Sequence, residues 1–420
     1  MPTINNAASG FRLIYKNPSK PIVAVSGLHR GENPQPGSAV ITAIRRVYPQ
    51  ARIVGLIYDP LESGVHAGSD APDAVYTMPY PSAGAESYFA RLAEIHQRER
   101  LDVILPCLDT EVDLLAGALD RLVEMGIRSF LPTHSSVQLR DKAHLVQLAE
   151  HAGCPVPATR CAHDLHSARE AAAALGMTQG RPVFVKGRLY EARAVSNFYE
   201  LDAAFVKMIE QWGGPVLLQQ RIEGEEFNVV GLGDGEGGLL GHCAIRKMLR
   251  TANGKGYGGM VVDDALLMHR ARALIAELKW RGPFELEFVR ADSGAGDGAH
   301  GGGADYYLLE INPRFPAWVG FPSAIGCNLP ARALDCALGR TAKQAITVCA
   351  PGNFFVRHSV DVAGSLANLR ALSVGGAFER AAPERHAPAS AALDHTGLSL
   401  SLAQPALSPS LTGVRHATHA

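Results

Sequence analysis

The chain has almost no imbalance of charge. Its 420 residues carry 40 Lys and Arg against 41 Asp and Glu, which gives a formal net charge of −1. Nucleic acids and anionic membranes recruit proteins through strongly basic surfaces, so we expect neither as a partner. Any anionic ligand must be bound by a local group of basic side chains.

Long apolar runs and paired cysteines are also missing. No stretch reaches the length of a membrane-spanning helix, and the N-terminal segment lacks the apolar core of a signal peptide. The seven cysteines include no C-x-x-C pair, and their odd number argues against a disulfide framework. These absences predict a cytoplasmic protein in a reducing compartment.

Several common catalytic motifs are absent. The sequence has no G-x-x-x-x-G-K-[ST], no H-E-x-x-H and no G-x-S-x-G, so Walker-type NTPases, zinc peptidases and nucleophile-elbow hydrolases lose their main support. Two G-x-G-x-x-G matches begin at Gly233 and Gly296, but both lie in predicted hairpin connections and do not join a strand to a helix. A dehydrogenase is therefore not expected.

The first part of the chain alternates strand-like runs with helical patterns. Runs such as PIVAVSG and LDVILPC are interspersed with helical stretches at 38–48, 86–99 and 112–126. Strands that alternate with helices of this size predict a parallel α/β sheet.

The second part has an α+β pattern. The short strand RPVFVKG closes on Lys186, and strand-like runs follow at 215–222, 225–233 and 238–245. A Gly-rich turn between the last two is typical of a hairpin. From about residue 381 the chain is rich in Ala, Pro, Ser and His without a sustained period, which predicts disorder.

The stretch YYLLEINPRF places polar residues at every second position as an apolar strand ends. Glu310, Asn312 and Arg314 should therefore lie on one face. A carboxylate, an amide oxygen and a guanidinium can together hold a divalent cation and its accompanying anion. Glu287, inside the neighbouring strand FELEF, adds a second carboxylate.

Two lysines stand at the ends of elements. Lys142 opens a predicted helix and Lys186 closes a predicted strand, and each supplies a point charge suited to phosphate. Mg²⁺ prefers one or two carboxylates plus phosphate oxygens to a full protein cage. The lysines and carboxylates together therefore predict a site for a triphosphate with magnesium.

In this order and at these spacings, the motifs resemble the ATP-grasp superfamily of carboxylate–amine ligases. The matching stretches are DK at 141–142, PVFVK, VLLQQRIEGEEF, GPFELEF and LLEINPRF, and the resemblance covers about residues 21–340. It implies an α/β pre-ATP-grasp domain followed by an α+β ATP-grasp fold. The implied boundaries are 1–133 for the first domain, 134–345 for the ATP-grasp domain with its lobes meeting at about 220/221, 346–380 for a C-terminal extension and 381–420 for a low-complexity tail.

The resemblance also implies cofactors and their contacts. ATP would be bound with Mg²⁺, and Mn²⁺ is an alternative metal. Lysines would contact the phosphates, hinge residues would line the adenine pocket and a glutamate would accept from the ribose. The implied nucleotide-binding residues are Lys142, Lys186, Gln219, Gln220, Ile222, Glu226 and Lys247.

Metal-binding and catalytic residues follow from the same resemblance. Carboxylate and amide oxygens would hold the cation, and Arg314 would face the reacting phosphoryl group. The implied metal ligands are Glu287, Glu310 and Asn312, and the implied catalytic residues are Arg314, Lys186 and Arg246. Trp318, Phe321 and Asn328 are expected either in the wall of an acceptor pocket or, for the aromatic pair, in the core.

The activity implied is formation of an amide or peptide bond. A small-molecule carboxylate would attack the γ-phosphate of ATP, and the acyl phosphate would then meet an amine, such as that of an amino acid or peptide, releasing ADP and phosphate. A related alternative is a bicarbonate-activating carboxylase or carbamoyl-phosphate-synthase-like enzyme. A binding module with little turnover is another alternative, because Gln219 replaces a common Glu and the loop after Lys186 lacks a run of glycines. A homodimer through the first domain is common in such folds.

Overall fold

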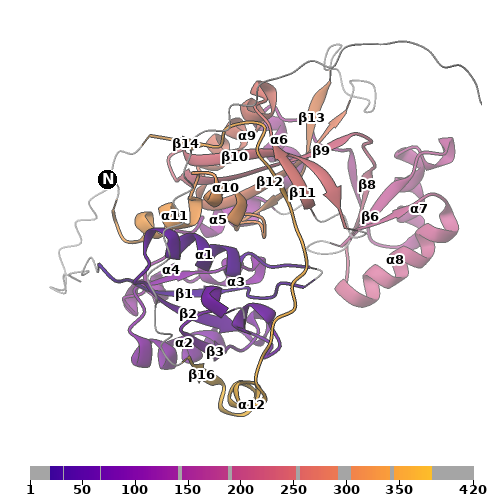
Figure 1. Ribbon diagram of the computed structural model, residues 1–420. Coiled ribbons are helices and arrows are strands. Elements are labelled where there is room, and N and C mark those ends of the chain that lie inside the picture. The colour runs from indigo at the N-terminus through magenta and orange to yellow at the C-terminus, as the bar shows by residue number, and fades with distance from the viewer. Residues whose placement is uncertain are drawn as a thin grey trace, which may run out of the picture. The chain divides into compact units, whose positions relative to one another are not determined.

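The computed structural model describes residues 19–31, 33–66, 68–140, 144–187, 192–251, 256–291, 304–340 and 345–380. Within these ranges the strands form three sheets, and helices pack on each of them (Figure 1). The predicted disordered tail and the low-complexity loop before Asp305 fall outside the described residues.

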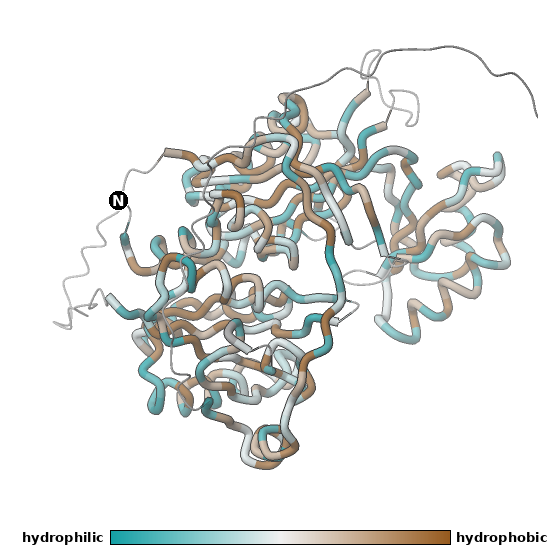
Figure 2. The backbone as a smooth tube through the Cα atoms, in the orientation of Figure 1, coloured by the Kyte–Doolittle hydropathy of each residue, from teal (hydrophilic) through white to brown (hydrophobic). Residues whose placement is uncertain are grey.

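The first sheet has the strand order β16-β3-β2-β1-β4. Strands β1 to β4 pair in parallel, which confirms the parallel α/β sheet expected from the alternating pattern. Hydrophobic stretches run along its strands (Figure 2), and both faces of the sheet are buried. Its first strands and helices are β1 (Ile22–Ser26), α1 (Gly37–Val47), β2 (Arg52–Ile57), β3 (Ala74–Thr77), α2 (Ala85–Glu99) and β4 (Val103–Leu105).

The helical stretch expected at 112–126 is two helices. The chain forms α3 (Asp109–Ala116) and α4 (Leu119–Glu124), and Ala118 between them leaves the helical region with φ −136°. Gly117 precedes it, and glycine is a poor helix former. The single helix was therefore a wrong prediction, because its apolar period continues across the break.

The chain returns to the first sheet near its C-terminal end. The last described elements are α12 (Leu366–Gly375) and β16 (Ala377–Glu379). Strand β16 pairs antiparallel with β3 and covers that edge of the sheet. This strand was not expected from the sequence.

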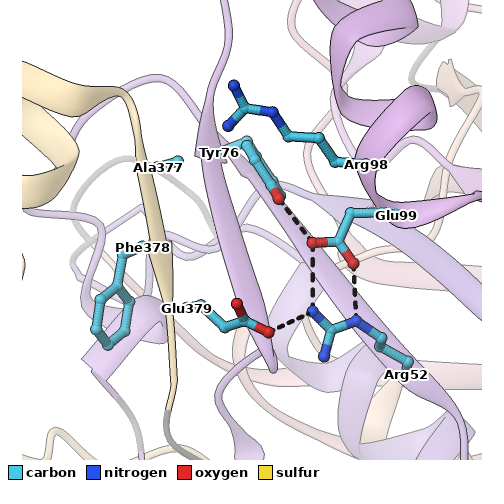
Figure 3. Close-up of a pocket in the computed structure, with 7 residues that line it drawn as sticks. All are labelled: Arg52, Tyr76, Arg98, Glu99, Ala377, Phe378 and Glu379. Carbon is cyan, nitrogen blue, oxygen red and sulfur yellow. Dashed lines mark hydrogen bonds and ion pairs between the residues drawn. The ribbon is translucent and has the colours of Figure 1, made fainter.

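Two ion pairs of Arg52 connect β16 to β2 and α2 (Figure 3). Arg52 bridges two carboxylates, with its Nε 2.7 Å from Glu99 Oε2 and its Nη2 3.0 Å from Glu379 Oε1. Tyr76 donates to Glu99 Oε1 at 2.6 Å. A cavity of about 460 Å³ lies beside these groups. The carboxylate of Glu99 is thus engaged in contacts that join the strands to α2.

The second sheet is antiparallel except for a short parallel edge at β14. Its strands are β9 (Glu225–Asp234), β10 (Leu239–Arg250), β11 (Gly256–Val261), β12 (Arg281–Ala291), β13 (Asp305–Asn312), β14 (Thr347–Val348) and β15 (Phe354–Val356). One face, with Phe227 and Phe288, packs on α6 (Leu145–His151) and α9 (Ala265–Leu278), around the fully buried Trp280. The opposite face carries the polar residues described below.

The third sheet has the order β5-β8-β6-β7. Two helices pack on it through a core of small and branched apolar side chains. Its elements are β5 (Thr159–Ala162), α7 (Leu165–Ala174), β6 (Val183–Lys186), β7 (Ala192–Val195), α8 (Phe198–Trp212) and β8 (Val216–Gln220).

The remaining helices are short and connect these layers. They include α5 (His134–Leu139), α10 (Gly320–Ala324), α11 (Leu329–Ala337) and the 3₁₀ turns Ser63–His66, Gly68–Asp70, Pro81–Ala83 and Met177–Gln179. Helices α10 and α11 contact α1, so the chain after the second sheet packs on the first. Among the described residues, no helix combines the length and apolarity needed to cross a bilayer; the cytoplasmic location stays a prediction.

A buried carboxylate sits at the carboxyl end of the first sheet. Glu111 has no exposed surface and accepts hydrogen bonds from Ser26 and, at 2.5 Å, from Tyr58. Burial raises its pKa from 4.5 to about 7, although these hydrogen bonds oppose the shift.

Glu111 should make the fold less stable as the pH rises. The pKa of Glu111 in the folded protein lies above its ordinary value. Its contribution to the free energy of unfolding is therefore complete below about pH 4.5 and is lost as the pH rises to about 7. The loss corresponds to at most about 3 kcal/mol. The free energy of unfolding in urea is measured for the wild type and Glu111→Gln across this range. As the pH rises, the wild type should lose stability relative to the variant. A difference that is constant with pH would contradict the assignment.

Candidate functional site

Cross-strand register gathers the predicted metal ligands on one face of the second sheet. Glu287 on β12 lies opposite Glu310 on β13 and opposite Asn228 on β9. Glu285, two residues earlier on the same face, lies opposite Asn312. The structure therefore brings Glu287, Glu310 and Asn312 together.

Lys247 lies on the same face and contacts both a predicted nucleotide-binding residue, Glu226, and a predicted metal ligand, Glu287. Its Nζ is 3.1 Å from Glu226 Oε2 and 2.9 Å from Glu287 Oε2, and its side chain is only 5 % exposed. Burial alone would lower the pKa of Lys247, but the Glu287 and Glu226 carboxylates outweigh burial and raise it. The ammonium is therefore a fixed positive charge.

Arg246 is placed differently. It precedes Lys247 on β10, so its side chain points to the other face of the sheet. It lies opposite Phe227 and pairs with Glu225 at 2.9 Å. The structure does not bring Arg246 together with Glu287 and Glu310, and its catalytic role stays a prediction without support from its position.

A cavity of about 550 Å³ lies between residues of the third and second sheets. Apolar side chains, including Phe184 and Val289, line part of it. Such a mixture of apolar walls and a few polar groups is typical of small-molecule sites. Five of the predicted nucleotide-binding residues line this one cavity: Lys186, Gln219, Gln220, Ile222 and Glu226.

Lys186 is held by a neighbouring strand of its own sheet. Its Nζ donates to Gln219 Oε1 at 2.5 Å, and Gln219 Nε2 donates to Thr159 Oγ1 at 3.0 Å. Gln219 was expected to line the adenine pocket. In the structure its side chain is 5 % exposed and positions the lysine.

Part of the predicted site falls outside the described residues. Lys142 is among them, and so are residues 188–191 of the loop that follows Lys186. Their predicted contacts with phosphate remain expectations.

Glu285 is a central residue that sequence reasoning missed. It is 5 % exposed and accepts from the Asn228 amide at 2.7 Å and from the Trp318 indole at 3.0 Å. Its second oxygen accepts from Asn312 and from Arg314, both at 3.3 Å. Glu285 and Glu287 share the two-residue spacing that singled out Glu310 and Asn312, so the same rule could have found it.

Arg314 links the second sheet to the first part of the chain. Its Nε lies 3.2 Å from Asp109 Oδ2 at the start of α3, and its Nη1 bonds Glu285. Burial alone would lower the pKa of Arg314, but Asp109 and Glu285 outweigh it and raise the pKa. Asp109 was not predicted, because no local pattern connects residues so distant in sequence.

The aromatic residues after Arg314 belong to the core. Trp318 is 6 % exposed and stacks on Phe355, with ring centroids 6.0 Å apart. Phe321 packs on the same ring at 5.1 Å. Asn328 caps α11 by accepting from Ala331 N at 3.1 Å. Trp318 is buried as the core interpretation predicts, and Phe321 is partly buried and packs against the same core. The expected place of Asn328 in a pocket wall stays a prediction.

The polar face fits a divalent cation that also has phosphate ligands. The Asn228 side-chain oxygen is buried without a hydrogen-bond partner in the described part of the chain. Asn312 directs its amide nitrogen to Glu285 and Glu287, which leaves its oxygen free for a cation. Within the described ranges, no group of three or more His, Cys, Asp or Glu is placed to hold a metal ion by itself. A cation held by Glu287, Glu310 and Asn312 would therefore need oxygens from a ligand.

Comparison with known proteins gives matches among solved structures. No protein-family model and no curated protein sequence matches the chain. Biotin carboxylase from Campylobacter jejuni, in its β,γ-ATP complex, matches with a TM-score of 0.58 at 15 % identity over 78 % of this chain and 73 % of that one. L-amino acid ligase from Bacillus licheniformis matches with a TM-score of 0.55 at 14 % identity over 76 % and 74 %.

A third match combines nucleotide, metal and anion in one crystal. The biotin carboxylase domain of 2-oxoglutarate carboxylase from Hydrogenobacter thermophilus, in complex with MgADP, ADP and bicarbonate, has a TM-score of 0.57 at 18 % identity over 77 % of this chain and 71 % of that one. At these identities the matches establish the fold. The chain has the ATP-grasp fold of these carboxylases and of the amino acid ligase, which confirms the fold that the resemblance implied.

Proposed function

We propose that the protein is an ATP-dependent carboxylate–amine ligase that works through an acyl phosphate and releases ADP and phosphate. The observation that carries the proposal is a single continuous site. One cavity collects Lys186, Gln220 and Glu226, and Glu226 shares the ammonium of Lys247 with Glu287. A nucleotide bound in the cavity would have its phosphates next to the predicted metal ligands.

The cavity suggests how ATP is oriented. Phe184, Ile222 and Val289 offer apolar contact to the base, and Glu226 offers carboxylate oxygens to the ribose. Lys186 at the end of β6 and Lys247 on β10 provide positive charge for the phosphates.

Glu287, Glu310 and Asn312 are the residues that would hold Mg²⁺, with Mn²⁺ as an alternative. The ion would neutralise charge on the phosphate oxygens as a substrate carboxylate attacks. Arg314 lies beside Asp109 and Glu285. From there its guanidinium would face the transferring phosphoryl group or the substrate carboxylate. Positioning of the substrate carboxylate against ATP and stabilisation of charge on the phosphate oxygens would accelerate the reaction, so no side-chain nucleophile is required.

Two other readings are tested by the same assay. Activation of bicarbonate is supported by the biotin carboxylases among the structural matches, one of which contains bicarbonate. A nucleotide-binding module with little turnover is the remaining reading. The proposed partners are small-molecule carboxylates and amines, and a homodimer remains part of the proposal.

ADP and phosphate release from Mg·ATP tests this function. The reaction is measured with and without the twenty L-amino acids, a set of small carboxylates and bicarbonate, for the wild type and Glu310→Ala. Release that requires an added carboxylate and amine would support the ligase. Release with bicarbonate alone would favour the carboxylase reading, and nucleotide binding without release in any mixture would contradict catalysis.

The matched control is a glutamate on the same sheet outside the site. Glu236 is exposed in the turn between β9 and β10. Glu236→Ala should keep the wild-type rate, because it removes the same charge without touching the polar face. A loss equal to that of Glu310→Ala would show that the assay responds to charge and not to the site.

A further inference from the structure

We infer that Glu285 is a positioning residue that fixes both Arg314 and the Asn312 amide for the proposed reaction. The inference rests on the proposed function of the same site. Four side chains point at Glu285, one from β9 and three from the end of β13 and the segment that follows it. They are Asn228, Asn312, Arg314 and Trp318.

All four neighbours are hydrogen-bond donors. Asn228 and Trp318 donate to Oε1 of Glu285, and Asn312 and Arg314 donate to Oε2. An ionised carboxylate has only acceptors, so it satisfies both pairs at once. A glutamine of the same shape has one oxygen and one NH₂ group, and its NH₂ must face a pair of donors. This position therefore requires a carboxylate for chemical and not only steric reasons.

The contact with Asn312 determines which end of its amide is available to a cation. Its Nδ2 lies 3.3 Å from Glu285 and 3.2 Å from Glu287. Since an ionised carboxylate cannot donate, the nitrogen must face these two residues, and the oxygen is the end of the amide left for a cation. Hydrogen bonds that orient a metal ligand in this way typically change metal affinity about 10–100-fold when they are removed.

The contact between Glu285 and Arg314 fixes the position of the guanidinium. Arg314 is held between Glu285 at 3.3 Å and Asp109 at 3.2 Å. Without the charge at Glu285, the guanidinium would keep its contacts with Asp109 and with the Phe315 carbonyl and lose the carboxylate that holds it on the second sheet. Glu285 thus holds two functional groups in place without contacting ATP, metal or substrate itself.

The test measures Mg²⁺ binding in addition to turnover. The wild type and Glu285→Gln are titrated with Mg²⁺ at saturating ADP, and the half-saturating Mg²⁺ concentration is read from the thermal stabilisation. We expect Glu285→Gln to raise this concentration at least about tenfold, with metal-free ADP binding unchanged. Turnover should fall through kcat more than through KM for ATP.

Two further variants separate positioning from a general loss of stability. Asp305→Asn breaks another buried ion pair on the same sheet, in which Asp305 lies 2.6 Å from Arg270, away from the site. It should lower the melting temperature and leave Mg²⁺ half-saturation unchanged. The double variant Glu285→Gln, Asn312→Asp should recover part of the Mg²⁺ affinity, because a carboxylate at position 312 offers the cation an oxygen whichever way it is turned.

The outcomes distinguish this inference from the proposed function. If Glu285→Gln lowers the melting temperature but leaves Mg²⁺ half-saturation within about twofold, Glu285 is structural and the inference is wrong. Failure of the second substitution to restore any affinity would also count against the role of the Asn312 amide. If the wild type shows no Mg²⁺-dependent ADP binding, the proposed function itself fails.

Discussion

Glu310→Ala is expected to lower ATP-dependent turnover about a thousandfold, equivalent to about 4 kcal/mol of transition-state stabilisation. Glu310 lies opposite Glu287 on the neighbouring strand, and the two supply the predicted carboxylate ligands of the cation. With one removed, the remaining carboxylate and an amide oxygen would hold Mg²⁺ only weakly. The phosphate oxygens would then lose the charge that offsets their own.

The same substitution should not unfold the protein. Glu310 is only partly buried, and Glu287 opposite it carries the same charge. Removing one of two facing carboxylates relieves repulsion, so the melting temperature without ligand should stay the same or rise. Steady-state ADP release and thermal unfolding measure the two effects together. A variant that is both stable and fully active would show that Glu310 is not a ligand.

Arg314→Ala is expected to cost about 3–5 kcal/mol of folding stability as well as activity. Its side chain is 15 % exposed and pairs with Asp109 and Glu285, which are 20 % and 6 % exposed at their side chains. Truncation leaves Glu285 with an uncompensated buried charge. It also disconnects the end of the second sheet from α3. Arg314→Lys should recover part of the stability and less of the activity, since an ammonium cannot bond both carboxylates in the same planar geometry.

Urea unfolding of Arg314→Ala, Arg314→Lys and the wild type tests this prediction. The exposed Arg370 on α12 gives a matched control, and Arg370→Ala should change the free energy of unfolding by less than about 0.5 kcal/mol. If Arg314→Ala were as stable as this control, the two ion pairs seen in the structure would not matter to the fold.

Local periodicity was enough to predict the polar end of β13. Glu310 and Asn312 lie on one face because strand side chains alternate, and this can be read from the sequence alone. The sequence also suggested that Glu287 lies on a strand next to Glu310, but the register that sets the two opposite each other depends on pairing across a connection and is seen only in the structure. The same alternation could have predicted the face on which Glu285 lies. Its role depends on the four hydrogen-bond donors around it, which only the structure shows.

Other features depend on contacts between distant segments. Arg314 and Asp109 are 205 positions apart, and no pattern in either segment refers to the other. Strand β10 continues to Arg250, well beyond the expected 238–245, because β11 pairs with it as far as Arg250. Strand β16 joins the first sheet through pairing with β3, although its own sequence is too short to predict a strand.

The most direct test of the central claim follows one oxygen atom. Carboxylates enriched in a heavy oxygen isotope are mixed with Mg·ATP, the amine pool and the protein, and the released phosphate is analysed by mass spectrometry. An acyl phosphate forms when the carboxylate oxygen attacks phosphorus, so attack by the amine should leave that oxygen in the phosphate. Phosphate carrying one heavy oxygen is the predicted result. Phosphate whose new oxygen comes only from water would contradict carboxylate activation and identify simple ATP hydrolysis.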